Sequence, residues 1–299
     1  MTMPRLFDRA LLAARRDRAR AHPRPGADFL LARAVDDLED RLATVLRRFE
    51  TAVDLGPFAG AAGPALRASG KIDRIVAAGP DAGAVDMVAD EEALPFGPES
   101  LDLVVSLLGL HLVDDLPGAL VQIRRALVGD GLFLAALLGG QTLNELRDSL
   151  TAAEVELTGG VSPRVIPFLD VRDLGGLLQR AGFALPVTDI DRVTVRYGSM
   201  FDLLADLRAM GATNPLVERS RKPTSRRLFL RAAEIYAERP ADPDGRLRAT
   251  FEIVWASGWT PHVSQQQPLR PGSATHRLAD ALHTREIPLA DRGGEEPES

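Results

Sequence analysis

The stretch 53–63 carries the first residues that could bind a ligand. It is a short apolar run that breaks into a turn with Gly56 and Gly60, ahead of an expected helix, and Asp54 stands at the end of the run. A strand that ends in such a turn brings backbone N–H groups and a helix N-terminus close to a ligand. Asp54 could orient this loop or only stabilise its turn. We therefore interpret the turn as a candidate nucleotide-type site, with an ordinary connecting loop as the alternative.

Four more polar side chains stand where other strands should end. Asp90 and Glu91 follow one expected strand, Ser106 ends the next, and His111 lies just beyond it. Groups in such positions open toward the ligand in parallel α/β sheets. His111 could act as a general base or close the pocket, and a packed, hydrogen-bonded histidine explains it equally well. The alternative for Asp90 is a loop acid or a helix cap beside its acidic neighbours.

The histidines and cysteines predict no metal centre. The five histidines are scattered, and His111 with Asp114 is a poor fit to the two-histidine, one-carboxylate arrangement that holds iron. The chain has no cysteine, which excludes disulfides, thiolate catalysis and cysteine-held metal clusters. His262, Gln141 and Thr142 are further candidates for a substrate site, although structural roles explain them more simply.

Alternating strands and helices must position these residues. Apolar runs indicate strands at 53–55, 72–78, 85–88, 101–106, 131–138, 185–187 and 193–197. Helical spacing indicates helices at 28–49, 62–69, 116–127, 142–153, 170–181, 199–210 and 224–238. This alternation predicts an α/β, Rossmann-like fold with a mostly parallel sheet and helices on both faces. We divide the chain into an N-terminal helical segment (1–49), a core (50–198) with a helical insertion at about 141–182, a C-terminal helical extension (199–286) and a disordered tail (287–299).

Composition limits the partners. With 299 residues, of which 45% are hydrophobic, the chain can bury a full core. A formal net charge of −6 excludes nucleic acid as the main partner. Residues 1–24 are arginine-rich, which is compatible with docking on a partner or with peripheral association with a membrane, and also with a solvated first helix. We expect no transmembrane segment and no secretory signal, and therefore a cytoplasmic protein.

The order of these motifs resembles that of class I S-adenosylmethionine-dependent methyltransferases, over roughly residues 50–200. The matching stretches are 53–60, Asp90, 94–96, 101–106, His111, Asp115 and 129–131. The resemblance implies seven strands in the order 3-2-1-4-5-7-6 and S-adenosylmethionine as the cofactor. It also implies that Asp90 faces the adenine amino group. The cofactor-binding residues that we carry over to this chain are Asp54, Gly56, Gly60, Asp90, Glu91 and Ser106.

A narrower resemblance covers nearly the whole chain. It is carried by the stretches 7–9, 89–92, 139–143, 173–175, 200–203, 258–262 and 272–274. They look like the methyltransferase-fold assembly factor of respiratory complex I, a family found in mitochondria and alphaproteobacteria and related to the biotin-pathway malonyl-carrier-protein methyltransferase. This resemblance implies a protein substrate, the iron–sulfur subunit of complex I beside the quinone site, and a role as an arginine hydroxylase.

Two departures from the family pattern predict weaker cofactor binding. Where the family has a glycine inside the first turn, this chain has Phe58, and Pro57 removes a backbone N–H. The acid that should end the second strand and hold the ribose is missing, and Asp81 stands two or three places later. We expect an S-adenosylmethionine-dependent methyltransferase acting on a protein or small-molecule acceptor. The alternatives are the arginine-hydroxylating assembly factor and a non-catalytic binding module with a degenerate cofactor site.

Overall fold

The computed structural model describes residues 5–81, 85–238, 242, 244–266, 278–281 and 283–284. The chain divides into two units, residues 1–262 and 263–299. All seven strands of the sheet lie in the first unit, and α9 (Leu278–Ala281) lies in the second. The tail expected at 287–299 lies outside the described residues, so its disorder stays a prediction.

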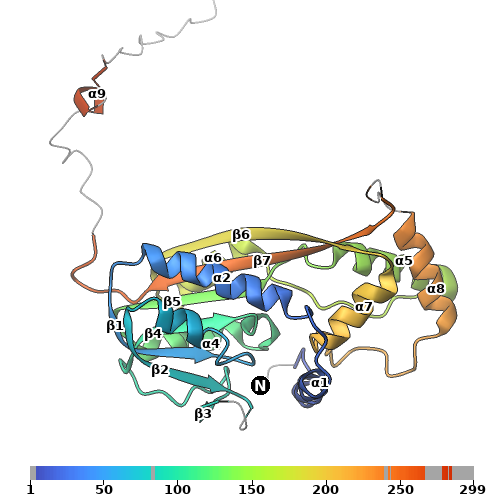
Figure 1. Ribbon diagram of the computed structural model, residues 1–299, viewed down its shortest axis with the longest axis horizontal. Helices are drawn as coiled ribbons and strands as arrows, with labels where there is room; N and C mark the ends of the chain where they lie inside the picture. The colour runs from blue at the N-terminus through green and yellow to red at the C-terminus, as the bar shows by residue number, and fades with distance from the viewer. Residues whose placement is uncertain are drawn as a thin grey trace, which may run out of the picture. The chain divides into compact units, whose positions relative to one another are not determined.

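A seven-stranded sheet forms the centre of the first unit (Figure 1). The strands are β1 (Phe49–Leu55), β2 (Ile72–Gly79), β3 (Met87–Val88), β4 (Leu101–Leu107), β5 (Leu127–Leu138), β6 (Ala184–Tyr197) and β7 (Leu247–Trp259). Their order is β3-β2-β1-β4-β5-β7-β6. Pairing is parallel from β3 to β5, whereas β7 runs antiparallel to both β5 and β6. The predicted α/β fold and strand order are therefore confirmed.

Helices cover both faces of this sheet. They are α1 (Arg9–Ala21), α2 (Phe29–Thr44), α3 (Gly63–Ala68), the 3-10 helix η1 (Leu110–Leu112), α4 (Leu116–Ala126), α5 (Asn144–Thr158), α6 (Val171–Arg180), α7 (Met200–Ala209) and α8 (Arg226–Ala237). One core contains the buried faces of α2, α3, α5, α7 and α8, and the other contains those of α4 and α6. Leu103 and Val105 of β4 face the first core and Val104 faces the second, as the two-residue period of a strand requires. This two-sided burial explains the continuous apolar run in β4.

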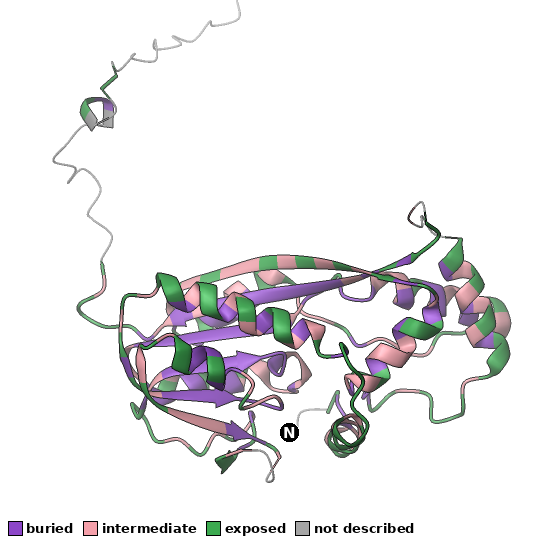
Figure 2. Ribbon diagram, viewed as in Figure 1, coloured by how far each residue is buried: buried purple, intermediate pink, exposed green. Residues whose placement is uncertain are grey.

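The last two strands differ from their predicted positions. Residues 185–187 and 193–197 belong to one continuous strand, β6, and the seventh strand, β7, lies within the stretch 199–286 that we expected to be helical. The polar residues that interrupt β6 contact α2, because Asp189 pairs with Arg41 and Asp191 with Arg33. In Figure 2, β6 alternates between partly buried and exposed residues, whereas β7 is mostly buried. Strand β6 lies at the edge of the sheet and contains polar residues in its middle. These residues made it resemble two short strands in the sequence.

Two helix boundaries also differ. The helix expected at 28–49 ends at Thr44, and Phe49 is the first residue of β1. The helix expected from Thr142 begins at Asn144 without a side-chain cap. Thr142 instead exchanges hydrogen bonds with the backbone of Glu252 in β7, which is why it does not cap the helix.

Candidate functional site

The carboxyl ends of β1 to β4 meet on the side of the sheet where α1 lies (Figure 1). The chain order reverses between β1 and β4, and such reversal points are where parallel α/β sheets bind ligands. A cavity of about 70 Å³ is enclosed here. It is lined by Arg9, Leu12, Ala13, Arg16, Pro80, Asp81, Glu91, Gly109 and Leu112. Helix α1 therefore forms one wall of the predicted cofactor site.

The first loop, residues 56–62, is held by Asp54. The Asp54 carboxylate is buried and accepts hydrogen bonds from the backbone N–H groups of Gly60, at 2.7 Å, and Ala62, at 3.0 Å. Burial raises the pKa of Asp54 to about 6, although these two hydrogen bonds act to lower it. Gly60 has a φ of +98°, a conformation that favours glycine. The contacts of Asp54 favour the turn-stabilising role over direct contact with a ligand.

Three predicted cofactor residues come together beside this loop. Gly56 has a φ of +126°, and a side chain there would begin 3.5 Å from the Ser106 hydroxyl and 3.6 Å from a Glu91 carboxylate oxygen. The Ser106 Oγ atom is fully buried and has no hydrogen-bond partner among the residues that the structure describes. Burial also raises the pKa of Glu91. Buried hydroxyls are nearly always paired, so the unpaired state of the Ser106 hydroxyl is unusual.

Arginines of α1 contact the acids at this edge. Arg9 Nη2 lies 2.7 Å from Asp90 Oδ1 and 3.4 Å from Glu91 Oε2, and its Nη1 lies 3.1 Å from Glu92 Oε2. Arg20 pairs with Asp81, the residue considered as a ribose acid. Asp90 is thus at the predicted site, but its carboxylate is engaged by α1.

Arg16 completes the set of α1 arginines in this cavity. Its side chain is partly buried, and this burial lowers its pKa, while the charges of Glu91 and Asp81 act to raise it. Sequence reasoning did not single out Arg9, Arg16 or Arg20 as site residues. Their spacing of seven and four residues was a usable signal, because it places them on one face of a helix.

The departures in the sequence have a structural explanation. At Gly79, the end of β2, an added Cβ would lie 2.2 Å from the backbone oxygen of Gly56, so an acid cannot stand there without moving the loop. Pro57 packs against Gly109, where an added Cβ would lie 2.6 Å from the proline ring. Phe58 packs against the core that contains α2 instead of lining the cavity. The Phe58 ring therefore does not occupy the cavity. At the position of the ribose acid, Gly79 allows β2 to pack closely on the loop 56–62.

His111 lies in η1, between this cavity and a larger one. Its Nδ1 is 3.5 Å from the backbone nitrogen of Leu138, and its ring centroid is 6.0 Å from that of Phe168. Burial lowers the pKa of His111 to about 3, and the charge of Arg16 adds to this effect. A neutral imidazole with so low a pKa is a weak base, so the geometry favours the pocket-lining role over proton abstraction.

The larger cavity measures about 660 Å³ and lies among α1, α2, α5 and α7. Both His111 and Thr142 line it. The backbone N–H of Gln141 points toward the Glu252 carboxylate, at 3.5 Å. His262 is not part of either cavity, because its ring packs on Gly129 near the start of β5. The structure thus brings His111 and Thr142 to one cavity and leaves His262 elsewhere.

The part of the chain that the structure describes contains neither a cluster of metal ligands nor a membrane-spanning helix. No three His, Asp or Glu residues there gather as a candidate metal site. None of its helices combines the length and apolar character needed to cross a membrane.

Comparisons with known proteins agree with the fold. A family model described as "Methyltransferase domain" matches residues 67–135. The rat protein "Arginine-hydroxylase NDUFAF5, mitochondrial" is 40% identical over 293 residues, which cover 93% of this chain and 85% of the relative. A malonyl-[acyl-carrier protein] O-methyltransferase from Laribacter hongkongensis is 35% identical over 62% of this chain and 59% of the relative. The crystal structure of YcgJ from Bacillus subtilis aligns with a TM-score of 0.51 at 13% identity, over 75% of this chain and 98% of that one, which shows the shared fold.

The relatives correct one expectation. The cytoplasmic location expected from the sequence is contradicted, because the rat, mouse and human relatives are all named as mitochondrial proteins. That expectation was based on the absence of a transmembrane segment and of a secretory signal from the sequence, and neither absence distinguishes the cytoplasm from the mitochondrial interior.

Proposed function

This chain belongs to the family of the arginine-hydroxylase NDUFAF5, and we propose that it is an enzyme that binds S-adenosylmethionine between the sheet edge and α1. The observation that carries this proposal is the buried, unpaired hydroxyl of Ser106, which faces the open side of Gly56 beside Glu91. A buried polar atom without a partner is costly, and a bound cofactor would remove that cost.

The donor set at this edge fits such a cofactor. Gly56 and Gly60 allow close approach to the backbone, Asp90 and Glu91 offer carboxylates to amino and hydroxyl groups, and Arg16 offers a cation to the methionyl carboxylate. When bound, the cofactor would supply an electrophilic methyl group. The enclosed space of about 70 Å³ is smaller than the roughly 300 Å³ of typical ligand pockets. Binding therefore requires α1 to move away from the sheet edge.

A second candidate function follows from the relatives. We propose as an alternative that the chain serves in the assembly of respiratory complex I by hydroxylating an arginine of its iron–sulfur subunit, a reaction that would take one oxygen atom from dioxygen and release the other as water with electrons from an external two-electron reductant. The support is the 40% identity that extends over 85% of a relative named as an arginine hydroxylase. Peripheral association with the membrane would suit this alternative function, because the iron–sulfur subunit lies beside the quinone site.

Ser106→Ala provides the test of cofactor binding. If the hydroxyl binds the ligand, Ser106→Ala should weaken S-adenosylmethionine binding roughly 3- to 10-fold in isothermal titration, the value of one hydrogen bond. The same variant should be more stable toward urea, because it removes an unpaired buried hydroxyl. Ser149→Ala is the matched control, since Ser149 is equally buried but donates to the Glu145 carbonyl at 2.8 Å. No binding by the parent protein, or equal binding by both serine variants, would reject the proposed site.

Mass spectrometry tests the alternative. Complex I purified from a strain that lacks this protein should carry an unmodified arginine in the iron–sulfur subunit, and the oxygen atom should return when the wild-type chain is restored. Restoration with the Ser106→Ala variant shows whether the modification depends on the proposed cofactor site. An arginine that is oxygenated in the deletion strain would remove the support for this function.

A further inference from the structure

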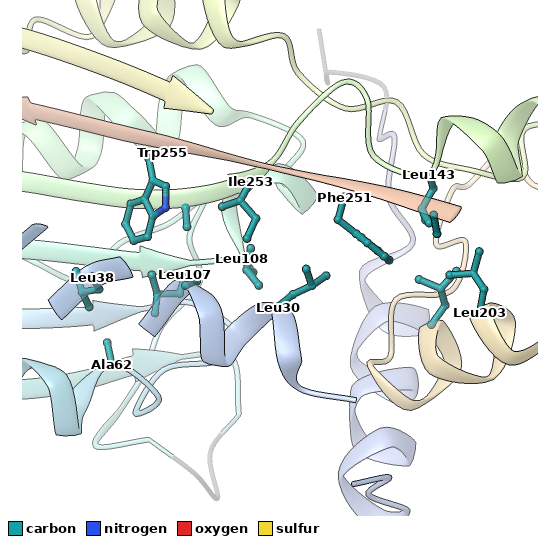
Figure 3. Close-up of a cluster of buried hydrophobic side chains, with 14 of the residues drawn as sticks. Leu30, Leu38, Ala62, Leu107, Leu108, Leu143, Leu203, Phe251, Ile253 and Trp255 are labelled. Atoms are coloured by element: carbon teal, nitrogen blue, oxygen red, sulfur yellow. The ribbon is translucent and has the colours of Figure 1, made fainter. Parts of the chain in front are cut away.

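The larger cavity has an apolar interior. Its wall is made by side chains from α1, α2, η1, β5, α5, α7, α8 and β7 together with the loops around 142–143, 162–168 and 210–224. Figure 3 shows Leu30, Leu143 and Phe251 on the side of the core nearest α7, and all three line the cavity. A volume of about 660 Å³ lies within the roughly 300–1,000 Å³ of small-molecule sites. The cavity is therefore large enough for a ligand with a sizeable hydrocarbon part.

The charged residues that line this cavity are all cationic. They are Arg15, Arg164, Arg208, Arg219 and Arg221, and no Asp or Glu is among the described residues of the wall. Three of the five are engaged: Arg15 with the carbonyls of Thr213 and Asn214, Arg164 with Glu154, and Arg219 with Asp8. Arg208 and Arg221 are exposed, and no ion pair joins either of them to a residue that the structure describes, although Arg221 lies near enough to Asp8 for their charges to attract.

This combination selects the charge of the ligand. Two exposed guanidinium groups at an apolar cavity attract a carboxylate, and the planar guanidinium matches a carboxylate by paired hydrogen bonds. A cationic ligand such as an arginine side chain would meet the like charges of Arg208 and Arg221 at the rim, which opposes binding. The cavity thus suits an amphipathic anion and not the guanidinium of a protein substrate.

We propose that the larger cavity binds a single unbranched acyl chain that ends in a carboxylate. The hydrocarbon chain lies against the leucine and phenylalanine wall, and the carboxylate lies between Arg208 and Arg221 at the exposed rim. This site is separate from the proposed cofactor site and does not require S-adenosylmethionine. If this chain hydroxylates an arginine, that arginine would have to reach the enzyme at a place other than the larger cavity.

Titration calorimetry with the full-length protein tests this site without added cofactor. Dodecanoate, used below its critical micelle concentration, should bind once per chain with micromolar affinity. Dodecyltrimethylammonium has the same chain and the opposite charge, and it should bind at least 10-fold more weakly. The double variant Arg208→Glu/Arg221→Glu should bind dodecanoate roughly 10- to 100-fold more weakly, the range for charge-assisted contacts. Arg125→Glu, on an exposed position of α4 outside the cavity, is the control.

Because both mutated arginines are exposed, the melting temperatures of the variants should match that of the parent. Any loss of affinity for dodecanoate can then be attributed to the lost contacts of Arg208 and Arg221. No dodecanoate binding, equal binding of both amphiphiles, or an equal loss in the Arg125→Glu control would each overturn the proposal. A failure of S-adenosylmethionine binding leaves these measurements untouched, so the two proposals fail separately.

Discussion

Arg9 competes with the proposed cofactor for the acids at the sheet edge, so its removal should strengthen cofactor binding. In the structure Arg9 contacts Asp90, Glu91 and Glu92 at 2.7, 3.4 and 3.1 Å, and its side chain is 30% exposed. Partly exposed ion pairs contribute about 0.2–1 kcal/mol each. The three contacts together therefore hold α1 in place with about 1–2 kcal/mol.

This energy sets the size of the effect. If the cofactor binds only when α1 has left the edge, its apparent affinity is reduced by the fraction of open molecules. Replacing Arg9 by glutamine removes the ion pairs and should raise the apparent affinity for S-adenosylmethionine roughly 5- to 30-fold. The effect should shrink at high salt, because the contacts of Arg9 with Asp90 and Glu92 are partly exposed.

Isothermal titration of the parent and the Arg9→Gln variant measures this change. Arg18→Gln is the matched control, because Arg18 lies on the exposed side of the same helix and does not line the cavity. Weaker binding by Arg9→Gln would refute the reasoning, since it would mean that Arg9 contacts the cofactor instead of competing with it. Equal changes in both variants would show only a general effect of charge.

Three further predictions concern stability. The pKa of Asp54 is raised to about 6 in the folded protein, so Asp54 stabilises the fold at low pH, and this stabilisation is lost as the pH rises through 6. The pKa of His111 is lowered to about 3, so neutral His111 stabilises the fold above about pH 6.5, and this stabilisation is lost on acidification. These trends oppose each other between about pH 4 and 6. Relative to the parent, urea unfolding should therefore show that Asp54→Asn loses stability on acidification through that range and that His111→Gln gains it, by up to about 1.4 kcal/mol per pH unit. Gly79→Asp restores the family acid in the sequence, but its Cβ would lie 2.2 Å from a backbone oxygen of the first loop; it should lower the unfolding free energy by about 2–4 kcal/mol and leave cofactor affinity unimproved in titration. Glu154→Gln should cost about 3 kcal/mol in urea unfolding at pH 7, because it leaves the mostly buried Arg164 without its carboxylate partner.

Local sequence patterns predicted those elements whose burial or backbone conformation restricts the residue types that can form them. The apolar run of β4 and the glycine turn after β1 were recognisable because two-sided burial and positive φ require those residue types. The seventh strand was missed although Leu247, Ala249 and Phe251 alternate with polar residues, because strands within a long helical region carry no marker beyond that alternation. The helix expected from Thr142 begins later because the Thr142 side chain hydrogen-bonds to the backbone of β7, more than a hundred residues away.

The candidate site was predictable only in part, for the same reason. Gly56 and Ser106 could be placed together because they stand at the carboxyl ends of the neighbouring parallel strands β1 and β4, and Glu91 follows β3 of the same parallel set. The engagement of Asp90 by Arg9 could not be predicted, because the two residues are 81 positions apart and the docking of α1 depends on packing across the whole edge. Charge pairs of this kind are visible in a sequence as two separate charged segments, without any sign of which acids the arginines will contact.

The two cavities share a wall, and this links the two proposed ligands. Leu12 of α1 and Leu112 of η1 each line both cavities. If the cofactor displaces α1, Leu12 leaves the larger cavity and an acyl chain there loses a contact, so each ligand should weaken the binding of the other. Thermodynamic linkage requires that dodecanoate lower the affinity for S-adenosylmethionine by the same factor that S-adenosylmethionine lowers the affinity for dodecanoate. Titrations of each ligand in the presence of the other measure both factors. Independent binding would mean that α1 stays in place when the cofactor binds, and the space for the adenosyl group would then have to come from movement of the first loop.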